Sequence, residues 1–221
     1  MRLRPDGGGR AGGRASLLRH LLPRPGFLPE HRDRDCEVLE LGAPSWPASV
    51  AWAEALPLAR VTRVEHEAVP RGARGGPAAQ WLALGARHAP AAIIDNALAA
   101  ADRGLALALL YPVLLPGGFY ILEDDDVPPP PAAGEQDRLA AMDHLAGLIE
   151  AAVVAGMFGP EQAAGAVAHL RATATHAWFR RGGIVIRKSR ALAASRSPAR
   201  LTILPLAQAV PETRRFDNGG A

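Results

Sequence analysis

Short runs that are apolar or alternate β-branched with polar residues, and that end near an acidic residue or a glycine, recur along the chain and predict strands. They occupy residues 37–41, 60–65, 91–96 and 119–122, and a further apolar run at 80–84 predicts one more strand. Continuous apolar strands are typical of a parallel sheet whose two faces are covered by helices, so the pattern favours an α/β fold.

Helical spacing predicts the elements between and after these strands. Apolar residues recur at helical intervals over 49–58 and 136–154, which are expected to form helices. Two runs rich in β-branched and aromatic residues, 173–179 and 183–188, flank a short turn that contains Gly182. These two runs predict an antiparallel hairpin that closes the sheet.

The chain is expected to turn sharply from helix to strand at Pro116. A helix rich in Leu and Ala precedes this proline, which cannot continue it, and the Gly-Gly pair that follows can adopt the positive φ of a reversal. The strand 119–122 then runs into the acidic pair Glu123 and Asp124. Parallel α/β sheets bind ligands at the carboxyl ends of their strands, so this pair is a candidate site.

The length and composition predict one domain with two terminal segments. A chain of 221 residues suits a single α/β domain. Residues 1–15 interleave arginine with glycine and are expected to form a disordered tail. The predicted elements fill residues 16–190, and residues 191–221 follow as a C-terminal extension without an assigned role.

Charge and cysteine content exclude some classes of function. The formal net charge is only +3, and the arginine-rich tail lacks aromatic residues, which argues against nucleic acid as the partner. No apolar run approaches bilayer-spanning length and no signal-peptide core is visible, so a cytoplasmic protein without membrane contact is expected. The single cysteine, Cys36, can form neither an internal disulfide nor a cysteine zinc site.

The Leu-Leu-Pro-Gly-Gly turn of residues 114–118, its apolar strand and the acidic pair resemble the fifth α/β unit of class I S-adenosylmethionine-dependent methyltransferases. The pair makes the likeness closest to the macrocin-type sugar and small-molecule O-methyltransferases, whose corresponding Glu-Asp binds a metal. The resemblance implies a single Rossmann-like domain with a mostly parallel seven-stranded sheet, helices on both faces and the hairpin as its closing strands. It also implies that Glu123 and Asp124 are metal ligands.

Residues 37–42, Glu-Val-Leu-Glu-Leu-Gly, resemble the first methyltransferase motif, in which an acid and a glycine loop surround the methionine part of the cofactor. The resemblance implies that Glu40 and Gly42 contact the cofactor. It assigns the ribose hydroxyls to Glu65, 23 residues after Gly42, with Glu67 as the alternative. The loop after Gly42 keeps one glycine of the usual two or three, which departs from the family pattern.

The strand 91–96 ends in Asp95-Asn96, where the macrocin-type enzymes read Asp-Asp-Gly-Ser-His. In those enzymes the second Asp binds the metal and the His is the proposed general base. The resemblance therefore implies that Asp95 and Asn96 contribute metal ligands. The Gly-Ser-His is replaced by the apolar residues 97–99, so no catalytic base is assigned.

Methyl transfer from S-adenosylmethionine to a hydroxyl of a small molecule is the function implied first, with Mg²⁺ as a candidate second cofactor. The alternative is a methyltransferase-like protein that has lost catalysis and serves as a binding or scaffold protein, because two motifs are incomplete. A nicotinamide-dependent reductase would also begin with a strand, a turn and a helix, but the Gly-x-Gly-x-x-Gly turn that it requires is absent.

Overall fold

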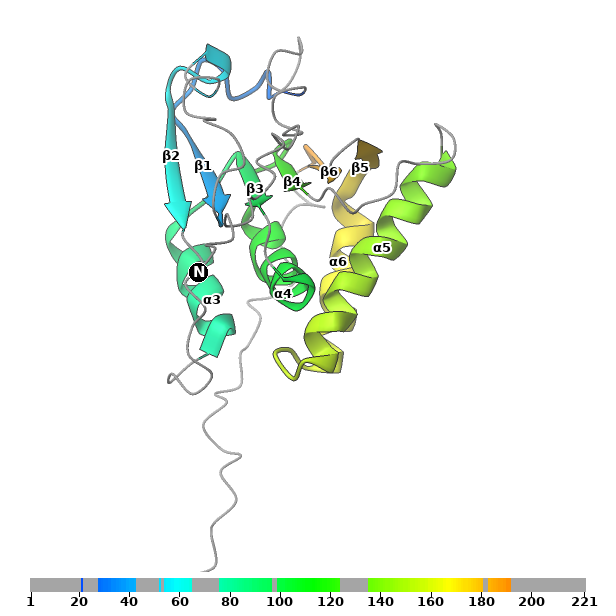
Figure 1. The fold of residues 1–221 in the computed structure, drawn as a ribbon. Coiled ribbons are helices and arrows are strands. Elements are labelled where there is room, and N and C mark those ends of the chain that lie inside the picture. The colour runs from blue at the N-terminus through cyan, green and yellow to red at the C-terminus, as the bar shows by residue number, and fades with distance from the viewer. Residues whose placement is uncertain are drawn as a thin grey trace, which may run out of the picture.

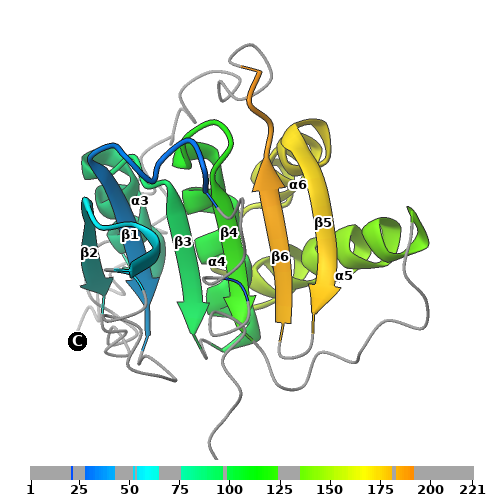
Figure 2. The ribbon, with the colours of Figure 1, turned by 90° about the horizontal axis from the view of Figure 1, so that it is seen from above.

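The computed structural model describes residues 21, 28–42, 52, 54–64, 76–96, 99–123, 135–180 and 183–191. In this part of the chain six strands form one sheet in the order β2-β1-β3-β4-β6-β5 (Figure 2). The strands are β1 Cys36–Leu41, β2 Ala59–Val64, β3 Ala92–Asn96, β4 Phe119–Glu123, β5 Ala174–Arg180 and β6 Gly183–Lys188. The helices with described bounds are α3 Gly76–Arg87, α4 Ala100–Leu110, α5 Glu135–Val154 and α6 Pro160–Thr173, and a 3₁₀ turn, η1, covers Tyr111–Val113.

The sheet is mixed. β2, β1, β3 and β4 pair in parallel, whereas β6 runs antiparallel to both β4 and β5. The α/β class, the pairing of β3 with β4 and the closing hairpin were predicted from the sequence and are confirmed. The mostly parallel sheet of seven strands is not matched, because the described residues form six strands with two antiparallel pairings.

Residues 80–84, predicted as a strand, belong to helix α3, so that prediction was wrong. Leucine and alanine are strong helix formers, and a five-residue apolar run is too short to distinguish the two periodicities. The helix buries Trp81 completely and packs Leu82 and Leu84 against the core.

Helix α6 was not predicted, although its amino end carries two recognisable signals. Pro160 occupies the first turn, where a missing N–H costs nothing. The backbone N–H of Gly159 donates to Gln162 Oε1 at 3.2 Å, which completes half of a capping box.

The two faces of the sheet carry separate hydrophobic clusters. Helices α3, α4, α5 and α6 lie together on one side of the sheet (Figures 1 and 2). The alternation of side chains along β3 sends Ile93 into the cluster on this side and Ile94 into the opposite one. Trp52 and Leu56 cover the opposite side, and the described residues between them are helical.

The turn between α4 and β4 agrees with the prediction at one glycine and differs at the other. Gly117 has φ +80°, as a reversal requires. Gly118 does not have a positive φ, but a Cβ there would lie 2.6 Å from the carbonyl oxygen of Ala91. The second glycine therefore permits close approach to the chain entering β3.

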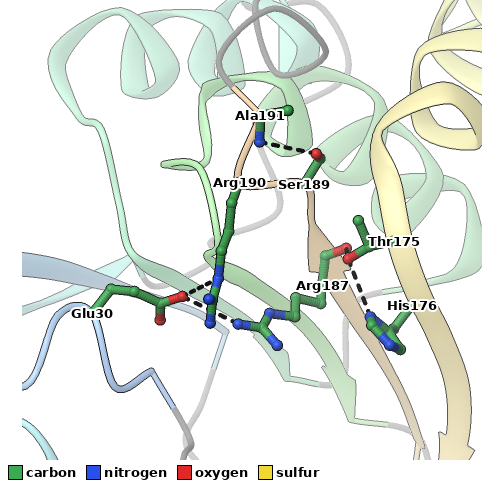
Figure 3. A network of polar contacts seen from close by, with 7 residues as sticks. All are labelled: Glu30, Thr175, His176, Arg187, Ser189, Arg190 and Ala191. Atoms are coloured by element: carbon green, nitrogen blue, oxygen red, sulfur yellow. Dashed lines mark hydrogen bonds and ion pairs between the residues drawn. The ribbon is translucent and has the colours of Figure 1, made fainter.

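The segment before β1 is fixed to the end of β6 by a shared carboxylate. Glu30 Oε1 lies 3.2 Å from Nη2 of Arg187 and also contacts Nε of Arg190 (Figure 3). The Arg187 guanidinium stacks over the Phe119 ring at 5.4 Å from its centroid. This contact lies at the amino edge of β4, away from the predicted site.

Several predictions fall outside the described residues. They concern the tail at 1–15 and the extension beyond Ala191. None of the described helices is both long enough and apolar enough to cross a membrane.

Candidate functional site

The strand order creates a topological switch point between β1 and β3. The chain leaves β1 for β2 on one side and later places β3 on the other side of β1. Ligands of open α/β sheets bind outside the carboxyl ends of strands at such a point. Residues 42, 96 and 123, at or just after the ends of β1, β3 and β4, lie at this edge.

Gly42 brings the ends of β1 and β3 into close backbone contact. It has φ +81°, and a Cβ at this position would lie 2.2 Å from the carbonyl oxygen of Asn96. Only glycine tolerates both the left-handed backbone and this approach. The structure therefore explains Gly42 at the position where the sequence predicted a cofactor loop.

Asn96 and Glu123 lie side by side at this edge. They are register partners in the parallel β3–β4 pair, so their side chains point to the same face. Both residues are buried, with 3% and 8% exposure. Asn96 Oδ1 has no hydrogen-bond partner among the described residues. A buried acceptor without a partner usually indicates a ligand, an ion or a water.

Asp95 points to the opposite face of the sheet. It is fully buried, its Oδ2 accepts a hydrogen bond from the Tyr120 hydroxyl at 3.2 Å, and its Oδ1 lies 3.8 Å from Arg103 Nε. Burial, and then the charge of Asp95, raises the pKa of Tyr120, so this hydroxyl stays protonated. The structure thus separates Asp95 from Asn96 and Glu123, the residues with which it was predicted to converge.

Glu40 is held beneath the edge by two side chains that the sequence analysis did not identify. The Trp52 indole donates to its Oε1 at 2.9 Å, and Arg63 Nε donates to its Oε2 at 2.8 Å. Glu40 is fully buried, and a buried carboxylate requires such partners. Its contact with a cofactor remains a prediction, and any such contact would share oxygens that already accept hydrogen bonds.

The remaining predicted site residues, Glu65 and Asp124, lie outside the described residues, as does the alternative Glu67. Within the described ranges no group of three His, Cys, Asp or Glu side chains is arranged to hold a metal ion. Oxygen donors are nevertheless present in Glu123 and Asn96, and hard cations such as Mg²⁺ prefer oxygen.

Besides Trp52 and Arg63, the sequence analysis missed Arg103 and Tyr120, which support the site through Asp95. A signal for Arg103 was available, because it is a lone basic residue in a helix otherwise rich in Ala and Leu. Its 7% exposure shows that its charge lies inside the protein, where a partner is expected.

No protein-family profile and no curated protein matches this chain. Among solved structures, the methyltransferase MycE from the mycinamycin biosynthetic pathway, in complex with Mg and SAH, is 18% identical. Its TM-score is 0.47, over 78% of this chain and 49% of that chain, so this chain spans about half the length of MycE. A protein-(glutamine-N5) methyltransferase from Alicyclobacillus acidocaldarius is 19% identical with a TM-score of 0.40, over 78% and 86% of the two chains. Human N-acetylserotonin methyltransferase in complex with SAM is 12% identical with a TM-score of 0.36, over 69% and 47%. Likenesses this weak assign neither a family nor an activity.

Proposed function

We propose that the protein is an S-adenosylmethionine-dependent methyltransferase that acts on a hydroxyl group of a small molecule. The observation that carries the proposal is the contact of Gly42 with the Asn96 carbonyl at the switch point of the sheet. This glycine follows the strand whose sequence resembles the first methyltransferase motif, and the hairpin closes the sheet as that resemblance implied.

The proposed reaction needs positioning above all. When bound, S-adenosylmethionine would supply a methyl group on a sulfonium; a lone pair of the acceptor oxygen would form the new bond to that carbon, and the carbon–sulfur electron pair would leave with S-adenosylhomocysteine. Holding the two groups in line supplies much of the rate. The acceptor proton would leave to water or to a carboxylate, for which Glu123 is the candidate because it lies beside Asn96 at the carboxyl end of β4.

In the proposed complex, Glu40 and Gly42 lie beside the methionine part of the cofactor and Glu65 binds the ribose hydroxyls. When no metal ion is bound, Asn96 Oδ1 supplies an additional acceptor at the same edge, which suits the cofactor ammonium or an ordered water. A buried acceptor without a hydrogen bond costs about 1–3 kcal/mol. A cofactor that donates a hydrogen bond to this atom would remove that cost.

The finer part of the proposal is a divalent cation held by Glu123, Asn96 and Asp124, without Asp95. When bound, such a cation would lower the pKa of the acceptor hydroxyl. We expect Mg²⁺ to raise the melting temperature of the wild type and to do so less for Glu123→Gln, at equal ionic strength. Equal shifts in both proteins would contradict a metal role for Glu123.

The second candidate function is a binding or scaffold protein on a methyltransferase-like fold. It is favoured by Glu40, whose two oxygens are already engaged, and by the absence of convergent metal ligands in the described ranges. This candidate predicts no methyl transfer to any acceptor.

Titration calorimetry with S-adenosylhomocysteine tests the proposal. We expect one site per chain with a Kd in the micromolar range, about −8 kcal/mol. A protein that is folded by circular dichroism but gives no binding heat at millimolar ligand would overturn it. Binding without turnover of a panel of hydroxylated acceptors, with and without Mg²⁺, would favour the second candidate.

A further inference from the structure

Arg103 reaches the carboxyl ends of two strands from behind the candidate site. Its Nη2 donates to the carbonyl oxygen of Glu123 at 2.9 Å, and its Nε lies 3.8 Å from Asp95 Oδ1. Arg103 belongs to α4, on the face of the sheet opposite to the Asn96 and Glu123 side chains. One guanidinium therefore contacts the carboxyl ends of both β3 and β4.

We propose that Arg103 is a positioning residue: by holding Asp95 and the Glu123 carbonyl, it fixes the Asn96 and Glu123 side chains on the other face. The inference rests on the proposed function for its consequence in ligand binding. Its structural content, a fixed strand edge, is independent of any ligand.

The coupling follows from the geometry of a strand. Asp95 and Asn96 are consecutive, so a rotation that moved the Asn96 side chain would also withdraw Asp95 from Arg103. Such a withdrawal is unfavourable because both charges are buried, and a buried charge without its partner is strongly destabilising. Hydrogen bonds from a charged donor are also the stronger kind, which suits a strand end that would otherwise fray.

The second acceptor that Arg103 binds, the Glu123 carbonyl, joins the neighbouring strand to the same guanidinium. Glu123 is the last residue of β4 and pairs with Asn96 on one side and Gly183 on the other. Arg103 binds the carbonyl of Glu123, and the Glu123 side chain points to the site face beside that of Asn96. Tyr120, on the neighbouring strand β4, completes the arrangement by donating a hydrogen bond from its hydroxyl to Asp95.

The test replaces the buried pair by neutral groups of similar shape in the double variant Asp95→Asn, Arg103→Met. Removing both charges together avoids leaving either one unpaired, so we expect a melting temperature close to that of the wild type. Hydrogen exchange at Asn96 and at Leu122–Glu123 should nevertheless accelerate about tenfold, because the strand ends are released. The Kd for S-adenosylhomocysteine should rise about tenfold or more, as expected when binding groups are misplaced.

The matched control is Asp143→Asn, Arg171→Met, which removes the 3.4 Å ion pair between α5 and α6 on the surface. It should leave both the exchange at the strand ends and the Kd unchanged. Wild-type exchange rates in the Asp95→Asn, Arg103→Met protein would overturn the inference. So would faster exchange combined with an unchanged Kd.

Two further outcomes keep the inference separate from the proposed function. If the wild type binds no S-adenosylhomocysteine but the strand ends still exchange faster in the double variant, the function fails and the positioning role stands. If the double variant does not fold, Arg103→Lys takes its place, since lysine keeps the charge but loses the fork that reaches two acceptors. Wild-type exchange in Arg103→Lys would then overturn the role.

Discussion

Two glycines border the candidate site because neighbouring backbones approach closely at both. Gly42 meets the Asn96 carbonyl, and a Cβ at Gly183, which has φ +149°, would lie 1.9 Å from the carbonyl oxygen of Leu122. These contacts fix β1 against β3 and β6 against β4 at the same edge of the sheet. The geometry of the site therefore depends on these two glycines, which have no side chain, as well as on the side chains of its other residues.

Gly42→Ala should be destabilising and should weaken ligand binding. An alanine in left-handed backbone costs about 1–2 kcal/mol, and its Cβ would also clash with a carbonyl that belongs to a central strand. We expect a loss of about 2–4 kcal/mol in the free energy of unfolding by urea. The control is Gly147→Ala in α5, where nothing lies within 4 Å of the added Cβ. Gly147→Ala should raise the free energy of unfolding by about 0.5–1 kcal/mol. Equal effects of the two substitutions would contradict the close contact of Gly42 with Asn96.

Lys188, the only lysine, couples the stability of the fold to pH. It is 1% exposed, and its Nζ donates to the carbonyl oxygens of Pro112 at 2.6 Å and Leu114 at 2.9 Å. Burial lowers the pKa of Lys188 from 10.5 to about 8. Between those values the unfolded chain holds a proton that the folded protein has released, so stability rises with pH in this window.

We expect this linkage to add about 1 kcal/mol to the free energy of unfolding between pH 7 and pH 9. The measurement is urea unfolding of the wild type and of Lys188→Met at both pH values. The difference between the two proteins isolates Lys188, because the burial that raises the pKa of the Cys36 thiol acts in both. The free energy of unfolding of the wild type minus that of Lys188→Met should therefore increase from pH 7 to pH 9. A value that stays constant or decreases would refute the linkage.

Helix α4 supports the site from below and packs between α3 and α5. Leu105, Leu107 and Leu110 are buried in the cluster that lies between the sheet and helices α3–α6. Gly104 brings α4 against α5, since a Cβ there would lie 1.8 Å from the carbonyl oxygen of Leu148. Arg103 immediately precedes Gly104. The close packing of α4 against α5 therefore also determines where the Arg103 guanidinium lies relative to the strand ends.

Gly104→Ala should separate the two helices. Overpacking of this kind costs about 1–3 kcal/mol, and the clash with backbone rather than with a flexible side chain favours the upper end. We expect a lower urea midpoint together with faster hydrogen exchange in α5. Gly165→Ala in α6 is the control, because its Cβ would meet nothing within 4 Å. If both variants unfold like the wild type, the close α4–α5 crossing is not present in solution.

The whole molecule divides its sheet between two tasks. The parallel part, β2-β1-β3-β4, presents the switch point, and the hairpin of β5 and β6 covers the remaining side of β4. Glu30 then joins the chain before β1 to the end of β6 through Arg187 and Arg190 (Figure 3). The candidate site and the closing hairpin thus belong to one sheet, so ligand binding should stabilise the fold as a whole.

A ligand that binds only the folded state at 100 times its Kd adds about 2.7 kcal/mol of stability. For a chain of this size that corresponds to a rise in melting temperature of about 5–10 °C. We expect S-adenosylhomocysteine to produce such a rise, in proportion to the logarithm of its concentration. Adenosine and methionine added together at the same concentration provide the control and should produce a much smaller rise.

Local patterns were enough to predict most strands, the hairpin and the turn at Pro116. Their signals are short-range: apolar runs match the length of a strand, and proline and glycine restrict the backbone whatever the rest of the chain does. The same reasoning failed at 80–84, where the helix propensity of alanine and leucine and the burial of Trp81 decided the outcome.

The local pattern correctly predicted that Gly42, Asp95, Asn96 and Glu123 lie at or next to strand ends. Which of these side chains meet depends on how the strands and helices pack. Successive residues of a strand point to opposite faces, so strand pairing joins Asn96 to Glu123, while burial of a charge joins Asp95 to Arg103, a residue of another element. Those partners depend on the register between strands and on the packing of α4, which no local pattern specifies.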